Sequence, residues 1–320
     1  MKVLITGGGG FIGSAVARYL IGKGMSVRVF DLVEPNIDGD IEKVRGSILD
    51  NNIICEAVRG CDAVVHLAAM LGVRKTEIER IDCLNINIGG TVNLLEACIK
   101  DGVKKIVFSS SSEVYGEPNV IPIKEDSELK PKSVYAVTKL ASEEYVKAYH
   151  KRYGIKYSIV RFFNVYGIGQ VAEFVLPRFV KAVLDGKPPM VYGSGEQVRS
   201  FCYMEDAAQG VYLALTKDEA IGDVFNIGND KAQISVKELA KKVIDISGKD
   251  LDICYVPMSE SDRDKGRDII LRQPDISKAV SSLGYSPQVS LDEGIRRLLS
   301  HGNIPDGWYE PMNYAKYGYK

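Results

Sequence analysis

Apolar runs and amphipathic stretches alternate along the first half of the chain. Short runs rich in β-branched residues predict strands at residues 2–6, 27–30, 41–47, 63–67, 104–108 and 157–160. Between these runs, apolar residues at helical spacing predict helices at residues 14–24, 50–59, 84–101 and 134–153. Regular alternation of strands and helices is typical of an α/β fold built on a doubly wound parallel sheet.

The pattern becomes less regular after Gly167. Helices are predicted at residues 176–184, 205–215, 236–246 and 275–283, with short strands at residues 190–192 and 224–227. We therefore predict two domains. Residues 1–166 form the parallel sheet, and residues 167–320 form mainly a smaller α/β cap that binds the substrate, with segments around residues 190–228 that return to the sheet.

The composition is that of an ordinary globular protein, with a formal net charge of −1 at pH 7. This balance gives no indication of nucleic-acid or membrane-surface binding, and no apolar run approaches the length of a membrane span. The first strand begins at residue 2, which leaves no room for a signal peptide. The six cysteines form no C-x-x-C pair and no cluster with the three histidines, so we expect free thiols, no metal site and a cytoplasmic location.

The first strand runs directly into four glycines, and a helix follows them. Such a junction leaves the unpaired N–H groups and the positive dipole end of the helix facing open space, which suits a phosphate anion. Gly7, Gly10 and Gly13 have the spacing G-x-x-G-x-x-G: Gly7 permits the tight turn, Gly10 the approach of a pyrophosphate, and Gly13 the packing of helix on strand. The pattern predicts a Rossmann-type dinucleotide site, and a glycine-rich turn without a ligand is the alternative.

Asp31 ends the second predicted strand, where an acid accepts hydrogen bonds from the ribose hydroxyls of adenosine. Leu32 and Val33 follow, at positions where a protein that binds a 2′-phosphate would carry Arg or Lys. These residues favour NAD over NADP as the cofactor. The nearby Arg28 keeps NADP open as an alternative.

Tyr135 and Lys139 lie four residues apart on one face of the predicted helix 134–153. A cation one helical turn away lowers the pKa of a phenol, which allows the phenol to act as a base near neutral pH. The pattern Y-x-x-x-K is common by itself and also fits a solvated helix face. Here it follows a cofactor loop and a serine-rich strand end, which favours the catalytic interpretation.

Four serines, at positions 109–112, and then Glu113 follow the fifth predicted strand. They lie at the carboxyl end of the strand, where open α/β sheets bind their ligands. A serine hydroxyl there can hold a substrate hydroxyl or ketone, or can only cap a loop. Glu113 can act as a general acid or base, or can accept hydrogen bonds from loop amides, and both interpretations stay open.

With these motifs in order, the chain resembles the extended short-chain dehydrogenases/reductases of the NAD-dependent nucleotide-sugar epimerase/dehydratase family. The resemblance covers nearly the whole length, and the ordered set is more specific than any one member. The motifs are TGGGGFIGS, HLAA, NIGGTVNLLEAC, SSSSEVYG, YAVTK, RFFNVYG, YGSGEQVRSF, FNIG and PDISKA.

The resemblance implies roles for individual residues. Tyr135 would take the proton of the sugar 4-hydroxyl while hydride passes to NAD, Lys139 would hold the nicotinamide ribose, and Ser111 would bond to the same hydroxyl. The residues expected to bind NAD are Gly7, Gly10, Phe11, Ile12, Gly13, Asp31, Leu32, Ser47, Ile48, Leu67, Ala68, Ala69, Asn87, Ser109, Tyr135, Lys139 and Phe162. Ser47 departs from the Asp that is usual in the family for the adenine amino group, which puts that contact in doubt.

The nucleotide-sugar substrate would contact Ser111, Ser112, Tyr135, Asn164, Arg199 and Arg272. Oxidation at carbon 4 gives a 4-keto sugar whose fate defines the enzyme: a 4-epimerase, which we place first, a dehydratase, a decarboxylase of a uronic acid, or a 4-dehydrogenase. Glu113 matches a catalytic Glu of dehydratases and decarboxylases, and Arg272 matches an arginine of the decarboxylases, whose fork suits a carboxylate. Phosphate binding or a surface salt bridge is the alternative for Arg272.

A protein that senses NAD without catalysis is the alternative from another class, and the presence of Tyr135, Lys139 and Ser111 together argues against it. The resemblance also implies a homodimer in which helices 84–101 and 134–153 pair with those of a second subunit in a four-helix bundle. The sequence does not identify the nucleotide or the sugar.

Overall fold

The computed structural model describes residues 1–34, 37, 41–72, 75–258 and 269–305. The chain divides into two compact units. The larger comprises Met1–Val165, Gln197–Gln233 and Asp262–Val289, and the smaller comprises Tyr166–Glu196, Ile234–Ser261 and Ser290–Lys320. Within the described ranges, no helix is long and apolar enough to cross a membrane.

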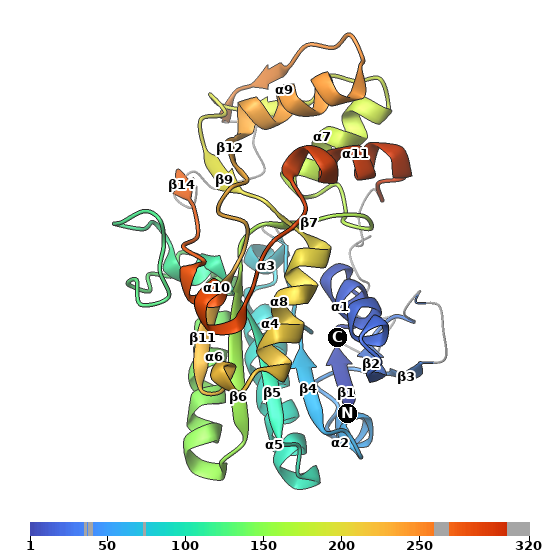
Figure 1. Cartoon of the computed structure of the whole chain (residues 1–320), viewed down its shortest axis with the longest axis vertical. Coiled ribbons are helices and arrows are strands. Elements are labelled where there is room, and N and C mark those ends of the chain that lie inside the picture. The colour runs from blue at the N-terminus through green and yellow to red at the C-terminus, as the bar shows by residue number, and fades with distance from the viewer. Residues whose placement is uncertain (35–36, 38–40, 73–74, 259–268, 306–320) are drawn as a thin grey trace. The chain divides into compact units, whose positions relative to one another are not determined.

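A seven-stranded sheet forms the centre of the larger unit (Figure 1). All neighbouring strands are parallel, and their order is β11-β6-β5-β4-β1-β2-β3. The bounds are β1 (Lys2–Thr6), β2 (Ser26–Asp31), β3 (Glu42–Arg45), β4 (Ala63–His66), β5 (Lys105–Ser111), β6 (Lys156–Phe162) and β11 (Asp223–Ile227). The predicted doubly wound parallel sheet is confirmed, with a seventh strand that comes from the second half of the chain.

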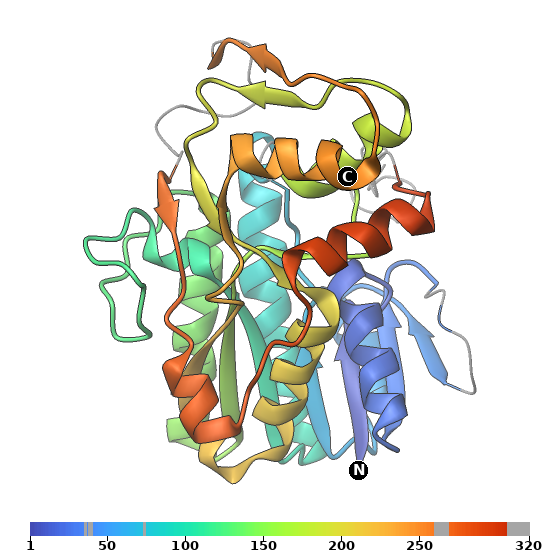
Figure 2. The same cartoon turned by 45° about the horizontal axis from the view of Figure 1, so that its top comes forward.

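Helices cover both faces of this sheet (Figure 1 and Figure 2). Val3 and Ile5 of β1 belong to the apolar core shared with α1 (Phe11–Gly22) and α8 (Met204–Thr216). Leu4, between them, belongs to the core under α2 (Asn51–Val58), α5 (Gly90–Asp101) and α6 (Val134–Tyr153). Because side chains alternate along a strand, the central strands β1 and β4 contribute to both cores, and their sequences are mostly apolar.

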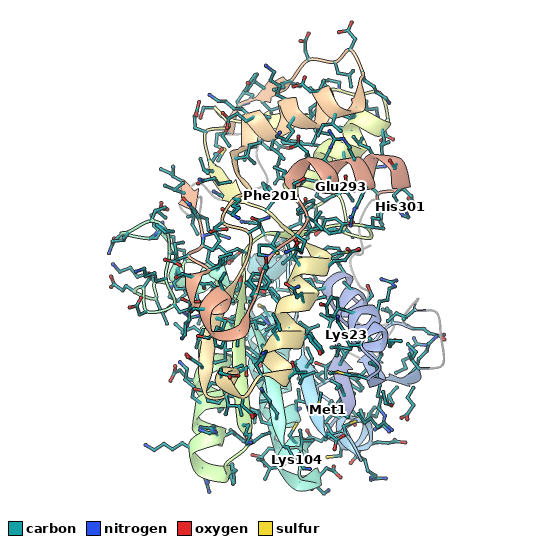
Figure 3. All side chains as sticks on the ribbon, in the orientation of Figure 1. Met1, Lys23, Lys104, Phe201, Glu293 and His301 are labelled. Atoms are coloured by element: carbon teal, nitrogen blue, oxygen red, sulfur yellow. The ribbon has the colours of Figure 1, made fainter. Side chains whose placement is uncertain are left out.

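The parallel direction of the strands separates the two edges of the sheet. Figure 3 labels Met1 and Lys104, which lie at the edge where β1 and β5 begin. The carboxyl ends of the strands, with Asp31 and the serines after Phe108, lie at the other edge. This is the edge at which open α/β sheets bind their ligands.

Helix α6 has its predicted bounds because both of its ends are marked in the sequence. The Ser133 hydroxyl caps the first turn and accepts a hydrogen bond from the N–H of Ala136 at 3.1 Å. Gly154 ends the helix with φ of 77°, a left-handed conformation that favours glycine.

The helix predicted at 84–101 starts earlier and is irregular. α4 (Arg80–Leu84), a π-helical turn η1 (Asn85–Gly89) and α5 follow one another without a break. A Cβ atom on Gly90 would lie 2.3 Å from Cδ1 of Ile48, so the close contact of this turn with the segment after β3 requires glycine. α1 also begins earlier than predicted, at Phe11, because Gly10 is its N-cap.

The remaining elements of the larger unit are short, and most have no periodic pattern that could predict them. β9 and β14 pair in parallel, with Arg199 and Arg272 as register partners. The short elements are α3 (Lys75–Ile78), η2 (Ser112–Tyr115), β7 (Val165–Tyr166), β9 (Val198–Ser200), β10 (Cys202–Tyr203), η3 (Asp218–Ala220), β12 (Gln233–Ser235), β14 (Leu271–Arg272) and α10 (Ser277–Leu283). Two of them, β7 and β12, contain the residues at which the chain passes from one unit to the other.

The smaller unit packs three helices together with a two-stranded parallel sheet. Its elements are α7 (Val175–Leu184), β8 (Met190–Tyr192), α9 (Val236–Ser247), β13 (Cys254–Val256) and α11 (Leu291–His301). The sequence prediction missed α11. Ser290, which caps it, and Glu293, whose N–H bonds to that cap at 3.2 Å, are the start signal that could have identified it.

A buried ion pair joins α6 to β6 in the larger unit. Nε of Arg161 donates to one carboxylate oxygen of Glu143 at 2.9 Å, and Nη2 donates to the other at 2.7 Å. The side chains are 2% and 0% exposed. Nη1 of Arg161 also donates to the Tyr115 hydroxyl, at 2.9 Å, and to the carbonyl of Glu125, at 3.0 Å. One guanidinium therefore fixes a helix, a strand and two loops.

The network continues into the last strand of the sheet. The Tyr115 hydroxyl donates to Oδ1 of Asn226 in β11 at 2.7 Å. Nδ2 of Asn226 donates to the carbonyls of Ile123, at 2.9 Å, and Asp275, at 3.3 Å. Every member is thus bonded, as a buried polar network requires.

We expect Glu143→Gln to destabilise the protein by about 3–5 kcal/mol, because it leaves the Arg161 guanidinium buried without a counter-charge. Glu144→Gln is the matched control. Its side chain is 65% exposed and pairs only with Lys147, so its effect should stay below about 0.5 kcal/mol. Urea unfolding of both variants measures the difference. Equal stability of the two would show that the buried pair does not hold this part of the sheet together.

Candidate active site

The glycine run forms a tight turn that lies directly against the segment after β4. Gly7 has φ of +71°, and a Cβ atom on it would lie 2.6 Å from the amide nitrogen of Ala68. A Cβ atom on Gly13 would lie 2.0 Å from the carbonyl oxygen of Gly7. Both positions therefore need glycine, one for conformation and close approach and the other for packing of α1 on the turn.

The N-terminus of α1 opens toward this turn. Gly10 is the N-cap, and none of the described side chains caps the helix. The first turn contains no acidic residue. The N–H groups and the positive end of the helix dipole are thus available to an anion. A pyrophosphate group fits these features, which the N–H groups of Phe11 and Ile12 provide, whereas the N–H of Gly10 donates to the carbonyl of Gly7 at 3.1 Å.

Asp31 lies beside the turn at the end of β2. Its carboxylate accepts the N–H groups of Gly9, at 2.9 Å, and Val33, at 3.2 Å. Burial raises the pKa of this carboxyl, and these backbone hydrogen bonds oppose the effect. The carboxylate is held in one orientation at the carboxyl edge, where it can accept hydrogen bonds from ribose hydroxyls. Together with the glycine turn, it fits the adenosine diphosphate part of NAD.

The residues predicted on the adenine side lie in the turn after β3. Ser47 accepts the N–H of Leu49 at 3.1 Å, and Ile48 is buried against Gly90. Leu32 is half-buried in the turn after β2. Arg28, which had kept NADP open, does not face this turn: it donates to Glu42 and to the carbonyls of Ala57 and Arg59.

A buried histidine supports the segment that follows β4. His66 is 1% exposed, and Nδ1 lies 2.7 Å from Oγ1 of Thr6 while Nε2 lies 3.0 Å from Oγ1 of Thr91. Thr91 donates its own proton to the carbonyl of Asn87 at 2.6 Å. Thr91 must therefore accept from Nε2, so the proton of the neutral ring lies on Nε2 and Thr6 donates to Nδ1. Burial, with the Lys139 charge, lowers the pKa of His66 to about 3 and keeps it neutral.

Asn87 holds the same segment from the other side. Its amide bonds both to the N–H of Met70, at 2.7 Å, and to the carbonyl of Met70, at 3.0 Å. It also donates to Oγ1 of Thr138 in α6 at 2.9 Å. The predicted cofactor contact of Asn87 stays a prediction, and the observed bonds fix residues 67–70 beside the glycine turn.

Lys139 reaches the carboxyl end of β5. Nζ donates to the carbonyl of Ser109 at 2.8 Å and lies 3.4 Å from its hydroxyl. It also lies 5.8 Å from the ring centroid of Tyr135. Burial lowers the pKa of Lys139 to about 8. Its ammonium is therefore placed between the strand end and the phenol ring.

Tyr135 and Ser111 meet at this edge. The Ser111 hydroxyl lies close enough to Tyr135 to lower the pKa of its phenol, and Oγ of Ser111 accepts the N–H of Glu113 at 3.2 Å. Burial and then the Glu113 charge act more strongly, and they raise the pKa of Tyr135. Desolvation of the phenolate therefore dominates the pKa of Tyr135, and the lowering of this pKa by Lys139 stays a prediction.

Glu113 is tied to the start of α6. The Ser133 hydroxyl donates to Oε2 of Glu113 at 3.0 Å and accepts the N–H of Ala136. The carboxylate therefore stabilises the helix end that carries Tyr135, two residues further on. Among the other predicted residues, Ser112 and Phe162 are buried, with exposures of 2% and 9%.

The predicted substrate residues at the ends of β6, β9 and β14 belong to the same unit. Asn164 has φ of 35°, a left-handed conformation rare for residues other than glycine, and its amide donates to the carbonyl of Ser200 at 3.2 Å. Arg199 and Arg272 are register partners on parallel strands, so both side chains leave the same face. Nη1 of Arg199 donates to the carbonyls of Val198, at 2.9 Å, and Ile270, at 3.4 Å. Two arginines on neighbouring strands suit a diphosphate.

Sequence reasoning missed Glu77 in this region. Its Oε1 accepts the N–H of Val134, the residue before Tyr135, at 3.3 Å, and its Oε2 accepts from Arg80 at 2.7 Å. A second carboxylate therefore lies at the start of α6. No local pattern could have identified it, because 57 residues separate Glu77 from Val134.

Comparison with known proteins gives independent information. The model of the NAD dependent epimerase/dehydratase family matches residues 3–228. Among curated proteins, the UDP-N-acetyl-alpha-D-glucosaminuronate decarboxylase of Bacillus cytotoxicus is 35% identical over 316 residues, which cover 93% of this chain and 96% of that protein.

Two solved structures are similar over nearly their whole length. The UDP-glucose 4-epimerase of Thermotoga maritima with UDP-glucose has a TM-score of 0.87 and 34% identity, over 94% of this chain and 98% of that one. The UDP-glucose 4-epimerase of Thermus thermophilus in complex with NAD has a TM-score of 0.86 and 30% identity, over 94% and 99% of the two chains. Both likenesses extend beyond the part that the family model matches.

We expect Gly13→Ala to destabilise the protein by about 2 kcal/mol or more and to weaken NAD binding, because its methyl group would collide with the Gly7 carbonyl. Gly22→Ala is the matched control in the same helix: among the described residues, no atom outside the neighbouring helix backbone lies within 4 Å of its Cβ position, so it should be neutral or slightly stabilising. Thermal unfolding and titration with NAD measure both effects. Gly13→Ala with the stability and affinity of Gly22→Ala would contradict the close packing of the turn.

Proposed function

The chain belongs to the NAD-dependent epimerase/dehydratase family, and on this premise we propose that it interconverts the two carbon-4 epimers of a nucleotide-diphosphate sugar. The two half-reactions are oxidation of the 4-hydroxyl to a ketone and reduction of that ketone from the opposite face. Both need the same catalytic groups. Support comes from Ser111, Tyr135 and Lys139, which meet at the carboxyl end of β5.

Each of the three residues has a task in this proposal. NAD, when bound, would supply the hydride acceptor and a positive charge that favours the phenolate. Tyr135 takes the proton of the sugar 4-hydroxyl and later returns it to the ketone. Ser111 donates a hydrogen bond to the phenol oxygen, and Lys139 contributes its positive charge and holds the nicotinamide ribose.

We choose a 4-epimerase over a dehydratase because of the position of Glu113. Epimerisation at carbon 4 needs one acid/base, because the proton that leaves in the first half-reaction returns in the second. Dehydration needs a further acid/base for carbons 5 and 6. Glu113, the residue predicted for that task, accepts a hydrogen bond from the Ser133 hydroxyl at 3.0 Å and so stabilises the start of α6. This favours epimerisation over dehydration.

Decarboxylation of a uronic acid is the second candidate. Arg272 lies beside Arg199 and provides a guanidinium fork for a carboxylate, and one relative is named a UDP-N-acetyl-alpha-D-glucosaminuronate decarboxylase. The pair also suits the substrate diphosphate in every one of the candidate reactions. For that reason Arg272 does not displace the epimerase as the first proposal.

We also propose a homodimer in the cytoplasm. Ile81 and Leu84 of α4 are 73% and 37% exposed, and Val137 and Tyr145 of α6 are 43% and 42% exposed. Such apolar side chains on two neighbouring helices suit a helix-bundle interface. The six free thiols suit a reducing compartment. In this proposal residues 1–166 bind mainly NAD, and residues 167–320 bind mainly the nucleotide sugar.

Product analysis with UDP-, GDP- and dTDP-sugars tests the reaction. We expect products of unchanged mass and inverted configuration at carbon 4, identified by mass spectrometry and NMR. Glu113→Gln should retain at least about a tenth of this activity, because the amide still accepts the Ser133 hydroxyl. Loss of water, of carbon dioxide or of two hydrogens from the product would instead assign a dehydratase, a decarboxylase or a dehydrogenase.

Tyr135→Phe removes only the phenol oxygen. We expect kcat to fall by about 10²- to 10⁴-fold, because the variant lacks the group that we propose to exchange the proton of the 4-hydroxyl, while the dissociation constant of NAD changes less than about threefold. Stopped-flow absorbance of the reduced cofactor and NAD titration measure the two quantities. A variant with full activity would refute the assigned role of Tyr135, and a protein that binds NAD but turns over no sugar would be a sensor.

A further inference from the structure

An arginine that the predicted site did not include lies next to Asp31. Arg45 is the last residue of β3 and the register partner of Asp31 in the neighbouring parallel strand. Its Nε donates to the carbonyl of Leu32 at 3.1 Å, which directs the side chain to the turn after β2. Arg45 is exposed. A cation is therefore present at the place where Leu32 and Val33 supply none.

The alternation of the two strands places Arg45 and Arg28 on opposite faces. Phe30 and its register partner Val44 belong to the core under α2, and Arg28 shares that face and bonds to the carbonyl of Ala57. Asp31 and Arg45 therefore point to the other face, toward the glycine turn. Arg45, and not Arg28, is therefore the arginine on the face where the 2′-phosphate of NADP would bind.

We propose that Arg45 is a specificity-determining residue at the adenosine ribose: it is the cation that holds a 2′-phosphate of NADP once the Asp31 charge no longer repels that phosphate. The inference rests on NAD binding and is independent of the fate of the sugar. Asp31 accepts the hydroxyls of an unmodified ribose and repels a 2′-phosphate. Arg45 brings the charge and the planar fork that accommodate a 2′-phosphate. Neutralising one side chain is therefore enough to admit NADP, and the gain depends on Arg45.

The neighbouring charges offer a matched control. Lys43 lies on the same face of β3, two residues earlier, which is roughly 7 Å further from the carboxyl edge. It is exposed and lies 3.7 Å from Glu34. Arg45→Met and Lys43→Met remove the same charge from the same strand and face. Only Arg45→Met removes it from the register partner of Asp31.

Competition between the two nucleotides tests the proposal without any sugar. Wild type, Asp31→Asn, Asp31→Asn/Arg45→Met and Asp31→Asn/Lys43→Met are dialysed to equilibrium against equal concentrations of NAD and NADP. The nucleotides retained by each protein are released with acid and quantified by chromatography. Asn keeps an oxygen that can accept the N–H groups of Gly9 and Val33, so the turn should keep its shape.

We expect the ratio of retained NADP to NAD to rise at least about tenfold in Asp31→Asn, since one repelling charge is removed. Arg45→Met in that background should reverse most of the rise, and Lys43→Met should leave it in place. An unchanged ratio in Asp31→Asn, the same ratio with and without Arg45, or an equal loss with Lys43→Met would overturn the proposal.

Thermal unfolding shows whether each variant is folded. If Asp31→Asn does not fold, the same comparison is made with Arg45→Met and Lys43→Met in the wild-type background. There, only Arg45→Met should lower the small fraction of NADP retained. Equal fractions in the two variants would overturn the proposal. The sugar reaction can fail its own test without changing either result, because no sugar is present.

Discussion

The guanidinium of Arg161 and the carboxylate of Glu143 are buried together, and neither can lose its partner without leaving a charge in the core. Their bond sets the distance between α6 and β6. Through Tyr115 and Asn226 the same guanidinium fixes the turn after β5 and the last strand of the sheet. The residues proposed for catalysis lie on the elements that this network joins. Their geometry therefore depends on a group that touches no ligand.

The start of α6 is the point where architecture and chemistry coincide. Ser133 caps the helix and donates to Glu113, and Glu77 accepts the N–H of the next residue. Carboxylates at the positive end of a helix dipole stabilise the helix. They also raise the local negative charge, and Glu113 is one cause of the raised pKa of Tyr135. A phenol in these surroundings needs positive charge close by before it can act as a base.

The shared first step and the variable second step have different structural origins. In the proposed function the glycine turn and Asp31 hold the cofactor end, and the backbone geometry of the turn tolerates little change. The fate of the ketone is there assigned to side chains at the substrate end, such as Glu113 and Arg272. Relatives at similar identity accordingly include a decarboxylase and a 4-epimerase.

Local sequence patterns determined much of the secondary structure of this protein and the form of its glycine turn. The buried strands, the bounds of α6 and the spacing of Gly7, Gly10 and Gly13 could be predicted because period, caps and glycine conformation act over a few residues. Tertiary structure alone decided which distant groups meet. It brought Glu77 to the start of α6, placed Arg45 and not Arg28 beside Asp31, and raised the pKa of Tyr135. Register, burial and desolvation arise from the packing of segments far apart in the chain, so no local pattern contains them.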